Sequence, residues 1–156
     1  MVTANRVIAL CAIVQIASLI VVGTVSDGFA RHVLQTAPIW LAMTAAVNDS
    51  RWAKWAALPV FLFWIGIAIL IWLFLLGIAR IASGHYSDIE IAMTVIFAAA
   101  GAIGSAAALS KRSGTPAWMA LLIFVSVAAA QVGVMAASLR YPISQDTTLI
   151  SWLRGL

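Results

Sequence analysis

The chain contains four long apolar runs, each close to the length that a helix needs to cross a lipid bilayer. About 20 residues suffice, because the hydrocarbon core is about 30 Å thick and a helix rises about 1.5 Å per residue. The runs cover residues 7–24, 56–79, 89–109 and 117–139. The 156 residues leave room for loops and short tails, but not for a second, soluble domain. We therefore expect an all-α integral membrane protein in which residues 1–156 form a single membrane domain.

The composition agrees with a membrane protein and excludes a nucleic-acid-binding protein. Of all residues 64% are hydrophobic and only 9% are charged, and the net charge is +4. The basic residues are scattered between the apolar runs, so the chain lacks the basic patch of a nucleic-acid-binding protein. We expect the lipid bilayer, and no nucleic acid, to be a partner. Seven of the nine basic residues are arginine, which favours a bacterial protein and hence the bacterial inner (plasma) membrane.

The first apolar run has two interpretations. Arg6 followed by a long apolar stretch describes either a retained transmembrane helix or a cleaved secretory signal. We favour the helix, because the run is long for a signal and no clean Ala-x-Ala cleavage site follows it. Cys11, the single cysteine of the chain, lies in this run, so no intrachain disulfide can form.

A fifth apolar run, Ala37–Val47, is too short to cross a bilayer as one helix. Thr36 and Pro38 are typical of a helix start, and residues 48–50 of a helix end. We expect a short interfacial or re-entrant helix between the first and second spans, on the membrane side of Trp52 and Trp118.

Small residues repeat along the third and fourth spans, which predicts close helix packing. A short connection between these spans suggests that they are neighbours and form the tightest helix pair. The small residues expected in this packing are Gly101, Gly104 and Ala108 on the third span, and Ala130, Gly133 and Ala137 on the fourth.

The positive-inside rule barely distinguishes the two membrane orientations of a four-span chain. It counts four Lys and Arg residues on one side and five on the other. Arg6 before the first span and Asp27 after it favour both termini in the cytoplasm.

No ionisable residue lies inside a span, so the usual marker of an intramembrane functional site is missing from the sequence. His85 lies near Asp88 and Glu90, but Ser87 and Glu90 match a helix capping box better than a metal motif. We therefore expect no metal site, no cofactor and no catalytic residue, and thus not an enzyme.

Uncharged polar residues do lie inside the spans. Gln15 and Gln131 have matching depths in a four-span arrangement, so we expect the first and fourth spans to be adjacent and the two amides to hydrogen-bond. The residues that form this polar pair, or alternatively line a pore, are Gln15, Ser18, Gln131 and Ser138.

The second span carries a line of aromatic residues, Phe61, Trp64 and Trp72, with a spacing that could dock a partner helix. We expect a small accessory or scaffold subunit of a larger membrane complex, which binds another membrane protein or itself. The alternative is a homo-oligomeric pore or uncoupled transporter lined by Gln15 and Gln131.

Overall fold

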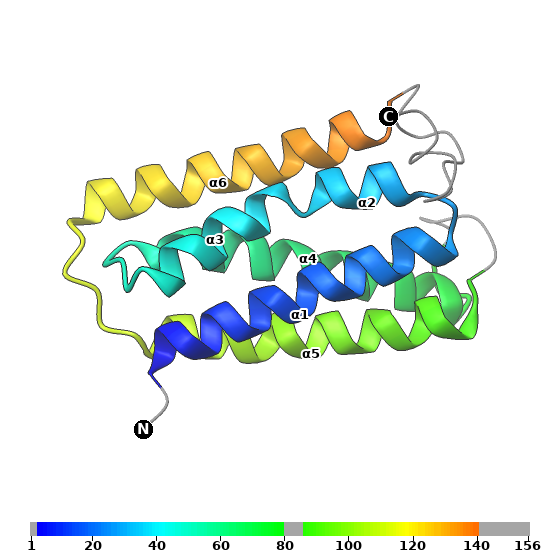
Figure 1. The fold of residues 1–156 in the computed structure, drawn as a ribbon, viewed down its shortest axis with the longest axis horizontal. Coiled ribbons are helices and arrows are strands. Elements are labelled where there is room, and N and C mark those ends of the chain that lie inside the picture. Colours follow the sequence, from blue (N-terminus) through cyan, green and yellow to red (C-terminus); the bar gives the residue numbers. More distant parts are fainter. Residues whose placement is uncertain (1–2, 80–85, 141–156) are drawn as a thin grey trace.

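A computed structural model describes residues 3–79 and 86–140 of the chain. Within these residues all regular secondary structure is helical, and four of the helices are long and apolar enough to cross a membrane (Figure 1). A short apolar helix lies between the first two of them, as the sequence predicts. The helices are α1 (Ala4–Val25), α2 (Phe29–Gln35), α3 (Ala37–Val47), α4 (Ala53–Leu75), α5 (Asp88–Ser110) and α6 (Ala117–Ser138).

The start of α5 confirms the predicted capping box. The Ser87 hydroxyl accepts a hydrogen bond from the Glu90 backbone N–H at 3.3 Å. The Ser87 N–H in turn donates to Glu90 Oε2 at 2.8 Å, so two amides that a helix start leaves without partners are both satisfied.

The helices α2 and α3 together run back along the whole length of α1 (Figure 1). They are separated at Thr36, where Pro38 has no N–H to continue the helical hydrogen bonding. The combined segment of residues 29–47 has a length of about 28 Å at the helical rise, close to the thickness of a bilayer core. The pair therefore crosses the bundle, and the expectation that the short helix stays at one membrane interface is corrected.

Hydrogen bonds at one end of the bundle fix this direction. Asn5 Nδ2 donates to Asp49 Oδ1 at 2.8 Å, which joins the start of α1 to the residues after α3. Lys111 Nζ, just after α5, donates to Asn5 Oδ1 and to the Ser50 carbonyl oxygen, both at 2.8 Å. Burial lowers the pKa of Lys111, and the nearby Asp49 carboxylate opposes that shift. We call this the Asn5 end, defined by Asn5, Asp49, Ser50 and Lys111.

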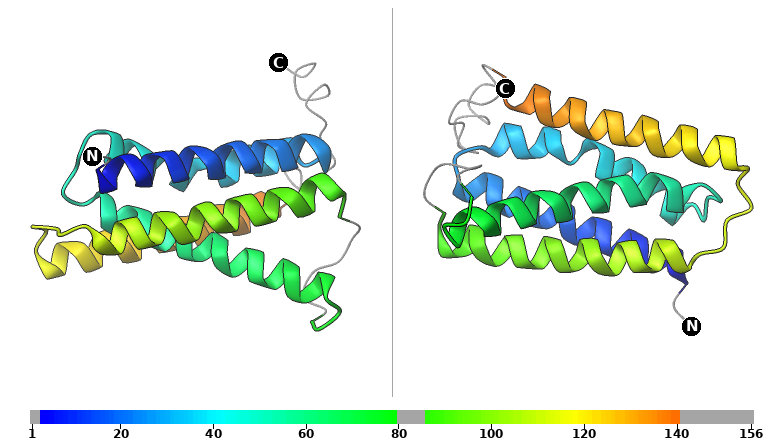
Figure 2. Two further views of the ribbon diagram at one scale, coloured as in Figure 1. Left: turned by 90° about the horizontal axis from the view of Figure 1, so that it is seen from below. Right: turned by 180° about the vertical axis from the view of Figure 1, so that it is seen from behind.

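The opposite end holds the start of α2, the start of α5 and the end of α6 (Figures 1 and 2). We call it the His32 end, after His32 in α2. The start of α1 and the end of α6 therefore lie at opposite ends of the bundle. This corrects the expectation, based on four crossings, that Arg6 and Arg140 lie on the same side.

The small residues of α5 pack against α1 and α4, and not against α6. No extensive contact joins α5 to α6, because the non-helical residues that connect them pass over the start of α4. There the Trp55 indole N–H donates to Ser113 Oγ at 3.3 Å, and Ser113 Oγ donates to the Arg51 carbonyl oxygen at 2.8 Å. The predicted pairing of the third and fourth spans is therefore wrong, although Gly101, Gly104 and Ala108 are indeed buried.

Two further faces differ from the prediction, since the small-residue face of α6 is exposed and the aromatic face of α4 is buried. Ala130 and Gly133 are exposed on the outside of α6. Phe61 and Trp64 of α4, predicted to face a partner, lie inside the bundle, with 0% and 3% of their surface exposed. The Phe61 ring fills the space beside Gly104 and the Trp64 ring packs against Phe97, so neither ring is available to a partner.

The Phe61 ring makes Gly104 sensitive to substitution. A Cβ atom at Gly104 would lie 2.5 Å from Phe61 Cε2, whereas a Cβ at Gly133 meets nothing within 4 Å. We predict that Gly104→Ala lowers the free energy of unfolding by about 1–3 kcal/mol, the usual effect of overpacking. Gly133→Ala is the matched control and should be neutral or slightly stabilising. Thermal unfolding in detergent measures both, and equal effects would contradict this packing.

Candidate functional site: a polar cavity between five helices

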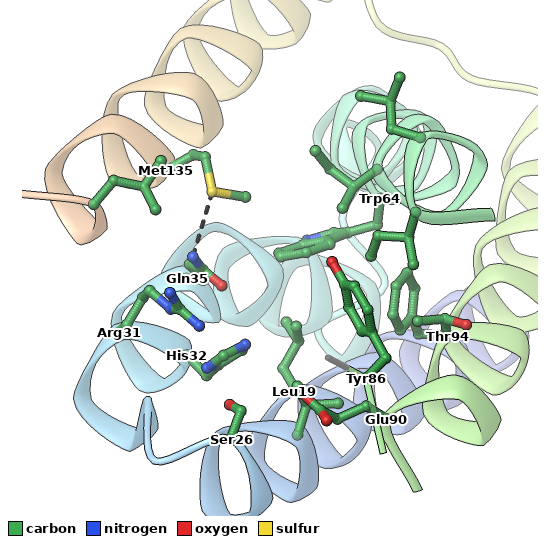
Figure 3. Close-up of a pocket in the computed structure, with 16 residues that line it drawn as sticks. Leu19, Ser26, Arg31, His32, Gln35, Trp64, Tyr86, Glu90, Thr94 and Met135 are labelled. Atoms are coloured by element: carbon green, nitrogen blue, oxygen red, sulfur yellow. Dashed lines mark hydrogen bonds between the residues drawn. The ribbon is translucent and has the colours of Figure 1, made fainter. Parts of the chain in front are cut away.

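A cavity of about 310 Å³ opens between α1, α2, α4, α5 and α6 at the His32 end. Figure 2 shows that α4 diverges from α1 toward the C-terminal end of α4. This volume is at the lower end of the roughly 300–1,000 Å³ typical of small-molecule pockets. Most of the wall is apolar, but several polar groups converge on it (Figure 3). We call this space the His32 cavity.

The α2 side of the cavity presents His32 and Gln35, both buried. His32 Nδ1 lies 2.9 Å from the Gly28 carbonyl oxygen, which orients the imidazole ring. Gln35 Nε2 donates to Ser138 Oγ at 2.9 Å and to the Met135 sulfur at 3.3 Å. These bonds attach α2 to α6 and leave Gln35 Oε1 without a partner among the described donors. An acceptor is thus held on the cavity wall next to the break between α2 and α3.

The α4 and α5 sides contribute aromatic rings. The Trp64 indole packs edge-on against Phe97, with ring centroids 5.8 Å apart. Its N–H group is buried and has no hydrogen-bond acceptor among the described residues. A buried donor without a partner costs free energy, so this N–H favours a ligand that offers an acceptor. Trp72, by contrast, is satisfied, since its N–H donates to Thr94 Oγ1 at 3.1 Å.

Charged and phenolic side chains line the cavity near the starts of α2 and α5. Arg31 comes from α2, Glu90 from the first turn of α5, and Tyr86 precedes α5 (Figure 3). Burial raises the pKa of Tyr86, the Glu90 carboxylate adds to the rise, and the Arg31 guanidinium opposes it. Tyr86 therefore keeps its proton at neutral pH and can donate it in a hydrogen bond.

A second, wider groove of about 640 Å³ lies at the Asn5 end. It is lined by Leu41 of α3, by Arg51 and Trp52 before α4, and by the first half of α6 up to Val127. We call it the Trp52 groove. The α6 helix thus borders one space toward each end of the bundle, because Met135 lines the His32 cavity, although Leu122 and Ser126 on the groove side are exposed.

Gln131 lines neither space, but along α6 it lies between Val127 of the Trp52 groove and Met135 of the His32 cavity. It is four residues from Val127 and four from Met135, or about 6 Å along the helix axis from each. The side chain is completely buried, and neither its Nε2 nor its Oε1 has a hydrogen-bond partner among the described residues. An unpaired amide in an apolar environment costs several kcal/mol on hydrocarbon transfer scales, about 1–3 kcal/mol on mutational ones.

The predicted bond between Gln15 and Gln131 does not form. Gln15 Nε2 donates instead to the Phe97 carbonyl oxygen at 3.2 Å, in the space that Gly101 leaves on α5. No extensive contact joins α1 to α6, because α2 and α3 lie between the two helices. Ser18 donates to the Val14 carbonyl oxygen within its own helix. None of the four polar residues lines either space directly, but Gln15 is bonded to Phe97 and Ser138 to Gln35, and both of these partners line the His32 cavity.

Gln131 and Ser138 are expected from the sequence to be polar residues inside the spans, whereas most residues that line the cavity are not expected from it. Arg31 and Tyr86 were not among the expected site residues, and Trp64 was expected to face a partner helix. A usable signal was the group Arg31, His32 and Gln35, which places three polar residues directly before an apolar helix. Among the described residues no group of three or more His, Cys, Asp or Glu side chains could hold a metal ion, and His85 lies outside the described ranges.

Comparison with protein-family models finds no match, and neither does comparison with curated proteins or with solved structures.

Two buried glutamines make a matched test of the site geometry. We predict that Gln35→Met, which removes two hydrogen bonds, lowers the free energy of unfolding by about 1 kcal/mol. Gln131→Met should leave it unchanged or raise it, since that amide is unpaired within the protein. Unfolding of both variants in the same detergent gives the comparison. Destabilisation by Gln131→Met as large as that by Gln35→Met would show that Gln131 has a partner in the protein.

Proposed function

We propose that the protein is an uncoupled transporter for a small solute, with the route inside one chain along the inner face of α6. The observation on which this depends is the unpaired, completely buried amide of Gln131 between two spaces at opposite ends of the bundle. The proposal follows the alternative expected from the sequence, a pore or uncoupled transporter. It differs in placing Gln131, but not Gln15, on the route.

An amide at this position has a physical use in transport. It offers one donor group and one acceptor to a molecule that leaves water, and it carries no charge that would hold the solute tightly. No ionisable residue lies in the middle third of any described long helix, so the route has no group that would couple it to a proton or ion gradient. The free energy lost by leaving Gln131 unpaired is offset when a solute binds there.

The test is solute entry into proteoliposomes made with the full chain, using radiolabelled glycerol, urea, serine and leucine as probes. At least one probe should enter faster than into protein-free liposomes. Gln131→Leu should slow that probe about tenfold, the equivalent of one lost hydrogen bond of about 1.4 kcal/mol. Ser105→Ala is the control, because it also removes a buried polar group without a hydrogen-bond partner among the described residues but lies on α5 outside the lining of both spaces, and it should change the rate less than about twofold. Entry of no probe, or unchanged entry with Gln131→Leu, would contradict the proposal.

The accessory or scaffold subunit is a second candidate, with a different surface from the one expected. The α6 helix is the least buried of the four long helices, and its outer face shows Ala130 and Gly133, at which a partner backbone can approach closely. The partner would be another membrane protein or a second copy of the chain. Native mass spectrometry after gentle solubilisation distinguishes these two partners from a monomer.

We also propose a location and an orientation. The excess of arginine over lysine favours a bacterial inner membrane. Among the described residues the Asn5 end carries five basic side chains (Arg6, Arg51, Lys54, Lys111 and Arg112), whereas the opposite end carries Arg31 and Arg140. The positive-inside rule then favours the Asn5 end, and with it the start of α1, in the cytoplasm. Arg80 and Arg154 lie outside the described residues.

A further inference from the structure

We infer that the His32 cavity binds a small zwitterion, a molecule whose anionic and ammonium groups lie close together on an apolar body. The anionic group would meet Arg31 and the ammonium group would meet Glu90. The inference names a substrate class for the proposed transporter. It rests on that proposal only where the zwitterion is said to cross the membrane. Binding in the cavity is a separate event and can be tested without transport.

The first argument is the pair of opposite charges on the cavity wall. Arg31 and Glu90 belong to different helices, α2 and α5, and Figure 3 shows them on different sides of the cavity, with His32 between them in that view. Both charges act on Tyr86, so both are within electrostatic reach of the same point. Yet they do not form an ion pair with each other, and Arg31 has no hydrogen-bond or ion-pair partner among the described residues. A ligand with both charges satisfies both groups at once.

The second argument is the partial engagement of Glu90. Its Oε2 atom accepts the Ser87 backbone N–H and the Ser87 hydroxyl, both at 2.8 Å. These bonds fix the carboxylate in place at the start of α5, while the other oxygen has no partner among the described donors. A carboxylate held in this way loses little conformational entropy on binding an ammonium group, and charge-assisted hydrogen bonds are about twice as strong as neutral ones.

The third argument is the shape and polarity of the remaining wall. Beyond the charged groups the cavity is lined by apolar side chains, among them Leu19, Ile67 and Phe97, which suit a compact hydrocarbon body. The unpaired Trp64 N–H adds one donor near the buried ring pair with Phe97. A volume of about 310 Å³ is too small for a lipid with two acyl chains. The chemistry matches an apolar α-amino acid, and the head group of a single-chain aminophospholipid offers the same pair of charges.

The experiment measures binding to the purified full-length protein in a neutral detergent by isothermal titration calorimetry. The probes are leucine, 4-methylpentanoate, which lacks the ammonium group, and isopentylamine, which lacks the carboxylate. Leucine should bind at least about tenfold more tightly than either single-charge analogue, because each charge-assisted contact contributes about 1.5 kcal/mol or more. A fourth probe, lysophosphatidylethanolamine, distinguishes the lipid source from the free amino acid.

Two variants test which charged group of the ligand Glu90 and Arg31 each bind, and a third is the control. Glu90→Gln keeps the capping box, since Gln also serves at that position, and it should reduce the affinity for leucine to that for 4-methylpentanoate. Arg31→Gln should reduce it to that for isopentylamine. Arg112→Gln removes an exposed cation at the other end and should change nothing.

The inference is overturned if neither zwitterion binds more tightly than the single-charge probes, or if Glu90→Gln and Arg31→Gln leave zwitterion binding unchanged. Binding of the lysolipid alone, with the same dependence on Arg31 and Glu90, supports it and identifies a lipid as the source. Charge-dependent binding without entry into liposomes contradicts only the proposed transport. Entry that is independent of Arg31 and Glu90 contradicts only the zwitterion.

Discussion

The arrangement of this bundle depends on how the chain satisfies its backbone hydrogen bonds between α1 and α4. A segment that contacts lipid must be helical and about 20 residues long to cross, and α3 has only 11 residues. Together with α2 it reaches the necessary length, at the expense of a break at Thr36 and Pro38. The break is tolerated because α1, α4 and α6 surround it and Gln35 bonds to Ser138 beside it.

This divided helix explains the positions of the polar groups. Because α2 and α3 separate α1 from α6, Gln15 pairs with α5 and Gln131 is left without a protein partner. Because α2 carries Arg31 and α5 carries Glu90 to the wall of the cavity, two opposite charges line a space whose wall is mostly apolar. Irregular backbone of this kind is tolerated at membrane depth where neighbouring helices surround it.

The sequence predicts the individual helices well and their arrangement poorly. Run length and capping residues locate all four long helices and the helix Ala37–Val47, because these signals are local. The sequence did not predict the seven-residue helix α2, because Arg31, His32 and Gln35 interrupt the hydropathy that marks a crossing segment. That omission changed the number of crossings, and the pairing of Gln15 with Gln131 depended on that number. The residue that packs against Gly104 could not be predicted either, because small residues indicate close packing but do not identify the ring or helix that fills the space.

The central claim, that α2 and α3 cross the bundle, is tested most directly by the distance between Asn5 and Ser50. Lys111 Nζ contacts both residues, so they must lie close together on one side of the membrane. In a Cys11→Ser background, Asn5→Cys and Ser50→Cys should be joined within one chain by a short bismaleimide. If both single cysteines react fully with a maleimide but the double variant forms no intramolecular cross-link, the segment does not cross and the account is wrong.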